Sequence, residues 1–165
     1  MSYGTLAASK TYHAARGNTA WAAGADADLD IALLRGSEFI DFNFRARFPG
    51  LKTDARAQDR EWPRSPAWDI EGNSIPSTEV PTEVENSTYE AALREQANPG
   101  SLMPDITLGE QLKRSRVEGA IDVEYTGVTG EQGMRPLLTI VSGILAPVLT
   151  GDDLGSSLAG RTART

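Results

Sequence analysis

Residues 26–48 read DADLDIALLRGSEFIDFNFRARF, and the prediction of the fold starts from them. Its large apolar residues recur at close to helical spacing and form one stripe: Leu33, Ile40, Phe44 and Phe48. Acidic residues fill its first turns and two arginines its last, which is the order that the helix dipole favours. Pro49 and Gly50 then end it. The stretch predicts one long amphipathic helix at the centre of a mainly α-helical fold.

Three shorter helices are expected around this one, so the fold is a small bundle of about four helices. Thr5 is a good N-cap for a helix over residues 6–16, which Gly17 closes. Pro81 suits the first position of a third helix that runs to about residue 97. A fourth helix is expected over about residues 135–149, where apolar residues again recur at helical spacing.

A β-hairpin inserted in the bundle is predicted for about residues 111–126. A basic strand, LKRSRV, and an acidic strand, IDVEY, are separated by three residues that can form a turn. That turn length predicts two cross-strand ion pairs on one face, Arg114 with Glu124 and Arg116 with Asp122. Such pairs fix the register of the two strands.

Residues 51–80 show no sustained period and contain several prolines and two tryptophans, so we expect a long ordered loop pinned by aromatic residues, or a functional arm. Cations and rings alternate in and just before this loop: Arg45, Arg47, Lys52, Arg56, Arg60 and Arg64, with Phe44, Phe48 and Trp62.

This cluster has three interpretations. A cationic groove with stacking rings is what single-stranded nucleic acid binds. Acidic residues interrupt the charge, however, and favour a salt-bridged loop packed on the bundle, which is the interpretation that we prefer. Arginine and tryptophan are also the residues enriched at protein interfaces.

The last sixteen residues, 150–165, read TGDDLGSSLAGRTART and cannot bury enough apolar surface to order themselves. We expect a flexible C-terminal arm after a bundle domain over residues 1–149. The preceding helix is apolar around more than half of its circumference, so its flank would face water in a monomer. We therefore expect Leu138, Ile140 and Leu149 to contact another subunit; an ordinary core helix with a frayed end is the alternative.

The sequence offers little for catalysis. It has no cysteine and one histidine, which excludes a thiolate nucleophile and a multi-histidine metal site. We expect His13, in an alanine-rich helix, to be solvated or half-buried rather than a catalytic base. No phosphate-binding loop motif is present. We therefore expect no enzymatic activity, no cofactor and no bound metal.

The charge and hydropathy point away from membranes. The formal net charge is −7, so the chain as a whole is not attracted to nucleic acid or to anionic lipid. The longest apolar run is too short to span a bilayer, and the N-terminus lacks a secretion signal. We expect a protein made in a cytoplasm-like compartment.

Several motifs, taken in order, resemble those of one family of tailed phages. They are YGT…A…YH…RGN…W at residues 3–21, FPGLKT at 48–53, WPR at 62–64, IPS..VP.EV at 75–84 and YE.ALRE.A.PGSL.PD at 89–105. Together with the hairpin they cover most of residues 1–149. The family resembles the head–tail connector proteins (adaptors, or head-completion proteins) of siphophages, and its members also carry the label DnaT-like single-stranded-DNA-binding.

The resemblance implies a structural role in the virion, for a protein made in the host cytoplasm. The protein would form a ring, usually of twelve copies, beneath the portal protein and extend the DNA channel towards a tail-side connector or tail terminator protein. Genomic DNA would pass through without sequence-specific binding, and an acidic wall would repel its phosphates. Residues expected to dock on neighbouring virion proteins are Trp62, Arg64, Trp68, Arg161 and Arg164. The alternative is a DnaT-like single-stranded-DNA-binding protein.

Overall fold

The computed structural model describes residues 1–104, 114–117, 121–124 and 138–150. Within these residues it contains five α-helices: α1 (Leu6–Ala14), α2 (Thr19–Ala22), α3 (Asp26–Phe44), α4 (Thr82–Ala97) and α5 (Thr139–Leu145). The mainly α-helical prediction is confirmed. The additional helix is α2, a single turn that follows the break at Gly17.

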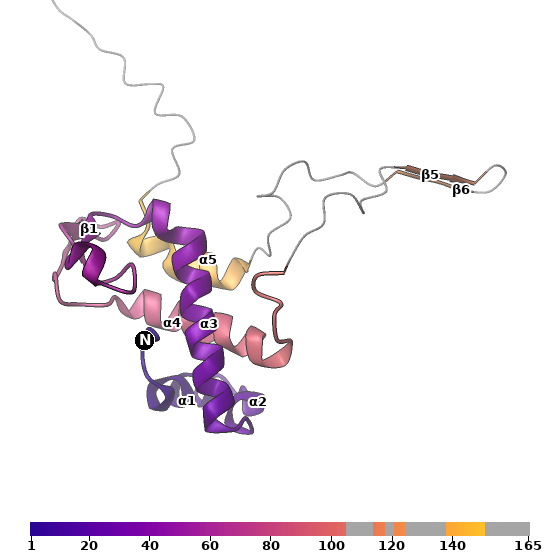
Figure 1. Cartoon of the computed structure of the whole chain (residues 1–165), viewed down its shortest axis with the longest axis horizontal. Coiled ribbons are helices and arrows are strands. Elements are labelled where there is room, and N and C mark those ends of the chain that lie inside the picture. Colours follow the sequence, from indigo (N-terminus) through magenta and orange to yellow (C-terminus); the bar gives the residue numbers. More distant parts are fainter. Residues whose placement is uncertain (105–113, 118–120, 125–137, 151–165) are drawn as a thin grey trace, which may run out of the picture.

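The centre of the body is the crossing of α3 and α4, with α1 and α2 at one end and α5 at the other (Figure 1). The two long helices approach each other closely at Gly36. A Cβ atom there would lie 2.9 Å from the carbonyl oxygen of Thr88 and 3.1 Å from the backbone nitrogen of Ala92. A larger residue at this position would push the helices apart.

The core has two hydrophobic clusters. One surrounds Trp21 between α1, α2 and the first half of α3, and the other joins the second half of α3 to α5 and to Trp62. The predicted stripe runs through both clusters: Leu33 belongs to the first, and Ile40, Phe44 and Phe48 belong to the second. Leu33 and Ile40 are fully buried, and Phe44 and Phe48 are nearly so.

The helix ends follow the sequence closely. The Thr5 hydroxyl accepts a hydrogen bond from the backbone N–H of Ala8 at 3.2 Å, so the predicted N-cap is confirmed. Gly17 has a positive φ of 71°, as a glycine that ends a helix commonly does. Pro81 is the N-cap of α4 rather than its first helical residue, and α3 tightens into a 3-10 turn at Arg45–Arg47.

The last helix is shorter than predicted. It begins at Thr139 after the N-cap Leu138, ends at Leu145 and continues only as a 3-10 turn, Ala146–Val148. Pro147 explains the early end, because it has no N–H to donate to the carbonyl four residues before it. Residues 135–137 of the predicted helix lie outside the described residues.

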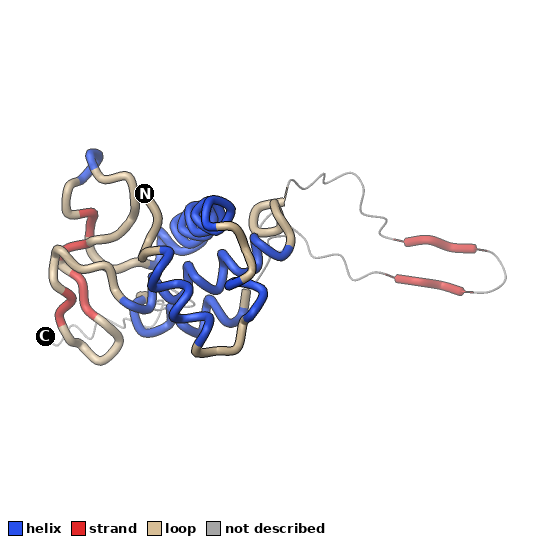
Figure 2. The backbone as a smooth tube through the Cα atoms, turned by 90° about the horizontal axis from the view of Figure 1, so that it is seen from below, coloured by secondary structure: helices blue, strands red, loops and turns tan. Residues whose placement is uncertain are grey.

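Residues 51–80 form an ordered loop with two very small antiparallel sheets. β1 (Leu51–Lys52) pairs with β2 (Arg64–Ser65), and β3 (Ala67–Trp68) pairs with β4 (Ser74–Ile75). In Figure 2 these strands lie together at one end of the body. The prediction of an ordered loop is confirmed for this segment.

The predicted hairpin has the predicted register. β5 (Arg114–Val117) is antiparallel to β6 (Ile121–Glu124), with Arg114 opposite Glu124 and Arg116 opposite Asp122. The turn and the rest of 111–126 lie outside the described residues, as does the predicted arm after Thr150. Both the backbone N–H and the hydroxyl of Thr150 donate to the carbonyl oxygen of Arg47 at 2.7 Å.

Candidate functional site

The ring of Trp62, the aromatic side chain central to the predicted cluster, lies inside the protein. It is 2% exposed and meets the ring of Phe48 edge-on at 5.6 Å between centroids. Its backbone N–H donates to the hydroxyl of Tyr3 at 3.0 Å. Trp62 is therefore a core residue, and the prediction that its side chain docks on a neighbouring protein is not compatible with this position.

The guanidinium group of Arg64 is also turned inward. Its Nε donates to the carbonyl oxygen of Pro49 at 2.8 Å, and its Nη2 donates to that of Gly50 at 2.7 Å. Its Nη1 lies 2.7 Å from a carboxylate oxygen of Glu61, and the residue is 7% exposed. Arg64 fastens the loop to Pro49 and Gly50, which follow the 3-10 turn Arg45–Arg47. The prediction that it docks on a partner is corrected in the same way as that for Trp62.

Arg60 ties the N-terminus to α3. Its Nε donates to the carbonyl oxygen of Met1 at 2.6 Å, and its Nη1 lies 3.4 Å from the carboxylate of Asp41. The other carboxylate oxygen of Asp41 accepts a hydrogen bond from the Tyr3 hydroxyl at 2.5 Å. Burial raises the pKa of Asp41 and, more strongly, the pKa of Tyr3. This network joins residues far apart in the sequence, and no local pattern could have indicated it.

The rest of the predicted nucleic-acid cluster provides charge without stacking rings. Arg45 and Arg56 are exposed, whereas the rings of Phe44 and Phe48 belong to the core. The preferred interpretation, a salt-bridged loop packed on the bundle, is therefore confirmed for residues 60–64. The sequence pattern missed Phe42, which lies on α3 with 48% of its surface exposed.

Trp68 behaves differently from Trp62. It is 51% exposed on β3, and Ile70, just beyond it, is 72% exposed. Of the five residues predicted to dock on a partner, Trp68 is the one that the structure places on the surface; Arg161 and Arg164 lie outside the described residues. Ile70 was not among the residues predicted to dock, although two apolar residues two positions apart would lie on one side of an extended strand.

The three residues predicted to form a subunit contact separate in the structure. Leu138 is 7% exposed and belongs to the core, and Leu149 is partly buried against it. Ile140 is 55% exposed. The apolar flank that α5 offers to a neighbour is therefore smaller than expected, because Leu138 caps the helix and turns its side chain inward.

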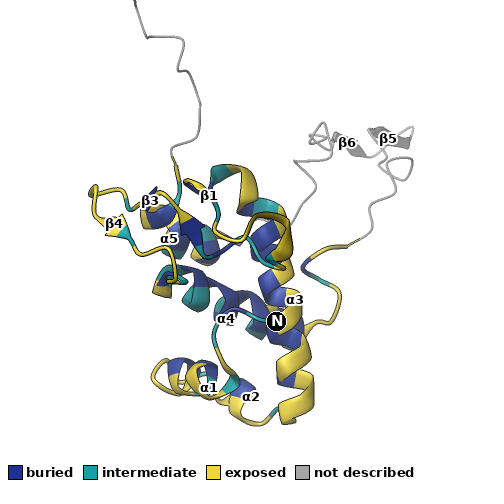
Figure 3. Ribbon diagram, turned by 60° about the vertical axis from the view of Figure 1, so that its left-hand side comes forward, coloured by how far each residue is buried: buried dark blue, intermediate teal, exposed yellow. Residues whose placement is uncertain are grey.

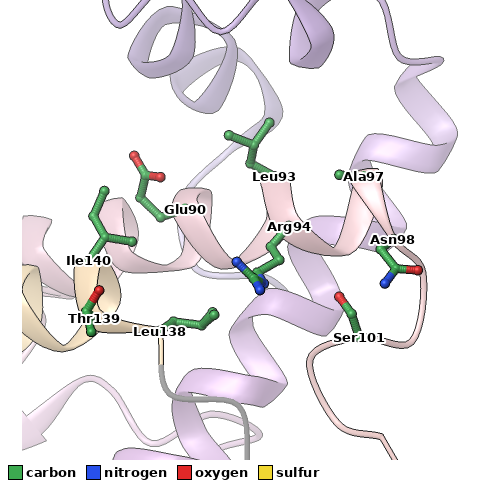
Figure 4. Close-up of a pocket in the computed structure, with 9 residues that line it drawn as sticks. All are labelled: Glu90, Leu93, Arg94, Ala97, Asn98, Ser101, Leu138, Thr139 and Ile140. Carbon is green, nitrogen blue, oxygen red and sulfur yellow. The ribbon is translucent and has the colours of Figure 1, made fainter.

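A groove of about 440 Å³ lies beside Ile140, between α4 and the start of α5 (Figure 4). The charged residues Glu90 and Arg94 line it, together with Leu138. The hydroxyl of Ser101, also in its wall, is buried without a hydrogen-bond partner among the described residues. The groove combines one charge of each sign with apolar walls, so it has no clear preference for an anion or a cation.

His13 is more buried than expected, at 1% exposure. One ring nitrogen lies 3.1 Å from the carbonyl oxygen of Tyr89, and the other lies 3.0 Å from the side-chain amide of Asn18. Burial lowers the pKa of His13. Its position between helices gives it a packing role.

Neither a metal site nor a membrane-spanning helix is found among the described residues. No group of three histidine, aspartate or glutamate side chains there is placed to hold a metal ion. None of the helices found in the described part of the chain has the length and hydropathy needed to cross a membrane.

One family model matches the chain over residues 1–165, and its description reads "Putative DnaT-like ssDNA binding protein". The chain belongs to this DnaT-like family. No curated protein and no solved structure matches the chain. The family model thus agrees with the label that accompanied the motif resemblance.

Proposed function

We propose that this protein is a structural, non-enzymatic head–tail connector of a tailed phage, which acts as a ring beneath the portal. The observation that carries the proposal is the inward placement of Trp62 and Arg64. The side chains that could have formed a DNA-gripping platform instead hold the loop on the helical body. The ordered motifs of residues 3–105 support the same proposal by resemblance.

The charge of the chain is consistent with this role. A protein that grips single-stranded DNA needs a cationic groove, whereas a conduit benefits from a wall to which phosphates do not adhere. The formal net charge of −7 suits the conduit. The partners that we propose are further copies of the chain, the portal protein and a tail-side connector or terminator. We propose that these contacts form in the virion.

The second candidate function is single-stranded-DNA binding, which the description of the family favours. The described residues offer it a limited surface. Arg45 and Arg56 are exposed, and Phe42 lies one helical turn before Arg45 on α3. Bases could stack on the ring of Phe42 while these arginines contact the phosphates.

A binding titration separates the two candidates. Fluorescence anisotropy of a labelled single-stranded oligonucleotide is measured at several salt concentrations, with the chain and with an Arg45→Ala/Arg56→Ala variant. We expect weak binding that the variant does not change. Tight binding with a steep salt dependence that the variant reduces would support the second candidate and contradict the first.

The connector role has its own test. An epitope-tagged chain is produced during phage assembly, and the tag is located on purified particles by electron microscopy. We expect it at the junction of head and tail. Its absence from purified particles that contain the portal would contradict the proposed function.

A further inference from the structure

The β3–β4 hairpin, residues 67–75, presents apolar side chains to solvent on a rigid backbone. One carboxylate oxygen of Asp69 accepts the backbone N–H groups of Glu71 at 2.9 Å and of Asn73 at 2.8 Å. The other accepts the side-chain amide of Asn73 at 2.9 Å. The backbone N–H of Ile70 donates to the carbonyl oxygen of Pro147 at 2.8 Å, which anchors the hairpin to the end of the body.

The anchoring fixes the shape of the hairpin but does not bury Trp68 and Ile70 within their own chain. They remain 51% and 72% exposed on a hairpin whose shape is already fixed. A preordered surface loses little conformational entropy when it binds, and tryptophan is among the residues that contribute most at interfaces. The hairpin has the properties of a docking element.

A second exposed apolar surface follows α3. We define the α3 stripe as the residues that recur every three or four positions on its outer face: Ile31, Leu34, Arg35, Glu38, Phe42 and Arg45. Ile31, Leu34 and Phe42 are 52%, 37% and 48% exposed. Leu34 and Phe42 lie on the side of α3 opposite its buried residues, whereas Ile31 borders a cavity that Glu95 and Gln96 of α4 also line.

The charges of the two surfaces are complementary. Residues 67–75 contain two acids, Asp69 and Glu71, and no base. In the α3 stripe, Arg35 is already paired with Glu95 of α4 at 2.6 Å, and Glu38 lies 3.9 Å from Arg60. The exposed Arg45 is therefore the base of the stripe that can meet an acid of the hairpin, although acids precede the stripe at the start of the helix. An acidic hairpin repels nucleic acid, so an apolar protein surface that carries an exposed base such as Arg45 is the better partner for Trp68 and Ile70.

The two surfaces lie on different sides of the body, and Figure 3 shows β3 and β4 at the left with α3 at the right. One chain cannot bring them together, but two copies side by side can. A contact between different patches of identical chains is heterologous, and repeating it produces a ring or a filament.

We propose that the β3–β4 hairpin of one copy docks on the α3 stripe of the next, which buries Trp68 and Ile70 against Leu34 and Phe42. The proposal rests on the proposed function, because it names the surfaces through which a connector ring would form. The second copy of the chain, rather than DNA or the portal, is the occupant of the stripe.

Cysteine cross-linking tests this contact directly, because the natural chain has no cysteine. The test chain carries Leu34→Cys and Ile70→Cys and is oxidised at high protein concentration. Each single variant is a control, and so is the pair Leu34→Cys/Met103→Cys, since Met103 is exposed and belongs to neither surface. If Leu34→Cys lowers the melting temperature, Ile31→Cys replaces it.

We expect a ladder of covalent dimers, trimers and larger species from the test chain, and its loss when Trp68→Ala is added. Single variants should yield no ladder, because the two cysteines of the contact lie on different copies. The proposal would be overturned if a single variant formed dimers equally well, if the control pair gave an equal ladder, or if no ladder formed. It would also be overturned if single-stranded DNA, but not Trp68→Ala, removed the ladder.

The result is distinguishable from a failure of the proposed function. If no ladder forms but the tagged chain is found at the head–tail junction, the docking contact is wrong and the connector role stands. If the ladder forms but the chain is absent from particles, the contact stands without the connector role.

Discussion

The two halves of the loop over residues 51–80 place their tryptophans in opposite environments. Trp62 is 2% exposed, and Arg64 beside it is fully engaged by backbone carbonyls and a carboxylate. Trp68 is 51% exposed on a hairpin that its own polar residues already hold in shape. An arginine and a tryptophan close together in a sequence therefore indicate an internal anchor as readily as a binding site. Burial, which their spacing does not reveal, decides between the two.

The first prediction tests the buried half. Trp62→Ala should lower the free energy of unfolding by about 3–5 kcal/mol, because it removes a large core side chain and leaves a cavity. Trp62→Phe should cost less, since it retains a ring. Urea denaturation followed by circular dichroism measures both. A loss below that of Trp68→Ala would reverse the comparison.

The second prediction concerns the arginine that holds this half in place. Arg64→Ala should lower the free energy of unfolding by about 2–3 kcal/mol, because the carboxylate of Glu61 and the carbonyl oxygen of Pro49 lose a charged donor. Arg64→Lys should recover only part of this, because an ammonium group cannot supply the guanidinium's directed donors. Thermal unfolding is the measurement. An unchanged Arg64→Ala variant would show that Arg64 is free to bind a partner after all.

These two residues also show how far the sequence could predict the structure. The helices were predictable because a repeating apolar pattern records which side faces the core, and the stripe that includes Ile40 is buried as expected. The loop has no such period, so nothing in it could tell that Trp62 points inward and Trp68 outward. The hydrogen bond between Tyr3 and Asp41 joins distant residues and has no local signature either.

The outcome for the predicted subunit contacts depended on where the last helix begins. Leu138 was expected on an apolar flank because the helix was expected to begin before it, at about residue 135. The helix begins after it, and Leu138 turns into the core. A shift of a helix start by a few residues therefore moved one of three interface predictions inside the protein, while Ile140 stayed exposed.

The third prediction compares the aspartate that contacts the buried half with an aspartate in the exposed half. Burial raises the pKa of Asp41, which contacts the buried half, so its folded-state pKa lies above its unfolded value. Relative to Asp41→Asn, the wild-type chain should lose stability as the pH rises above the unfolded-state pKa of about 4, because the unfolded state releases this proton first. Urea denaturation across this pH range measures the difference. A difference that grows in favour of wild type with rising pH would contradict the sign.

Asp69 of the exposed hairpin should show the opposite sign. Hydrogen bonds from the side chain and backbone of Asn73 lower the pKa of Asp69 below its unfolded value. Relative to Asp69→Asn, the wild-type chain should lose stability as the pH falls below about 4, because the unfolded state then takes up the proton first. Carboxyl carbon shifts in a nuclear magnetic resonance titration should give Asp69 a lower pKa than Asp41. The reverse order of the two pKa values would contradict this prediction.

The fourth prediction has the smallest effect on folding. Trp68→Ala should change the free energy of unfolding by no more than about 0.5 kcal/mol, because half of the side chain is in water and the hairpin is held by Asp69. Denaturation in urea provides the check, with Trp62→Ala measured in parallel. A loss of several kcal/mol would mean that Trp68 supports its own fold. A neutral result, combined with loss of the cross-linked ladder, would mean that this tryptophan serves a contact outside its own chain, since a side chain that contributes little to folding has its effect at the interface.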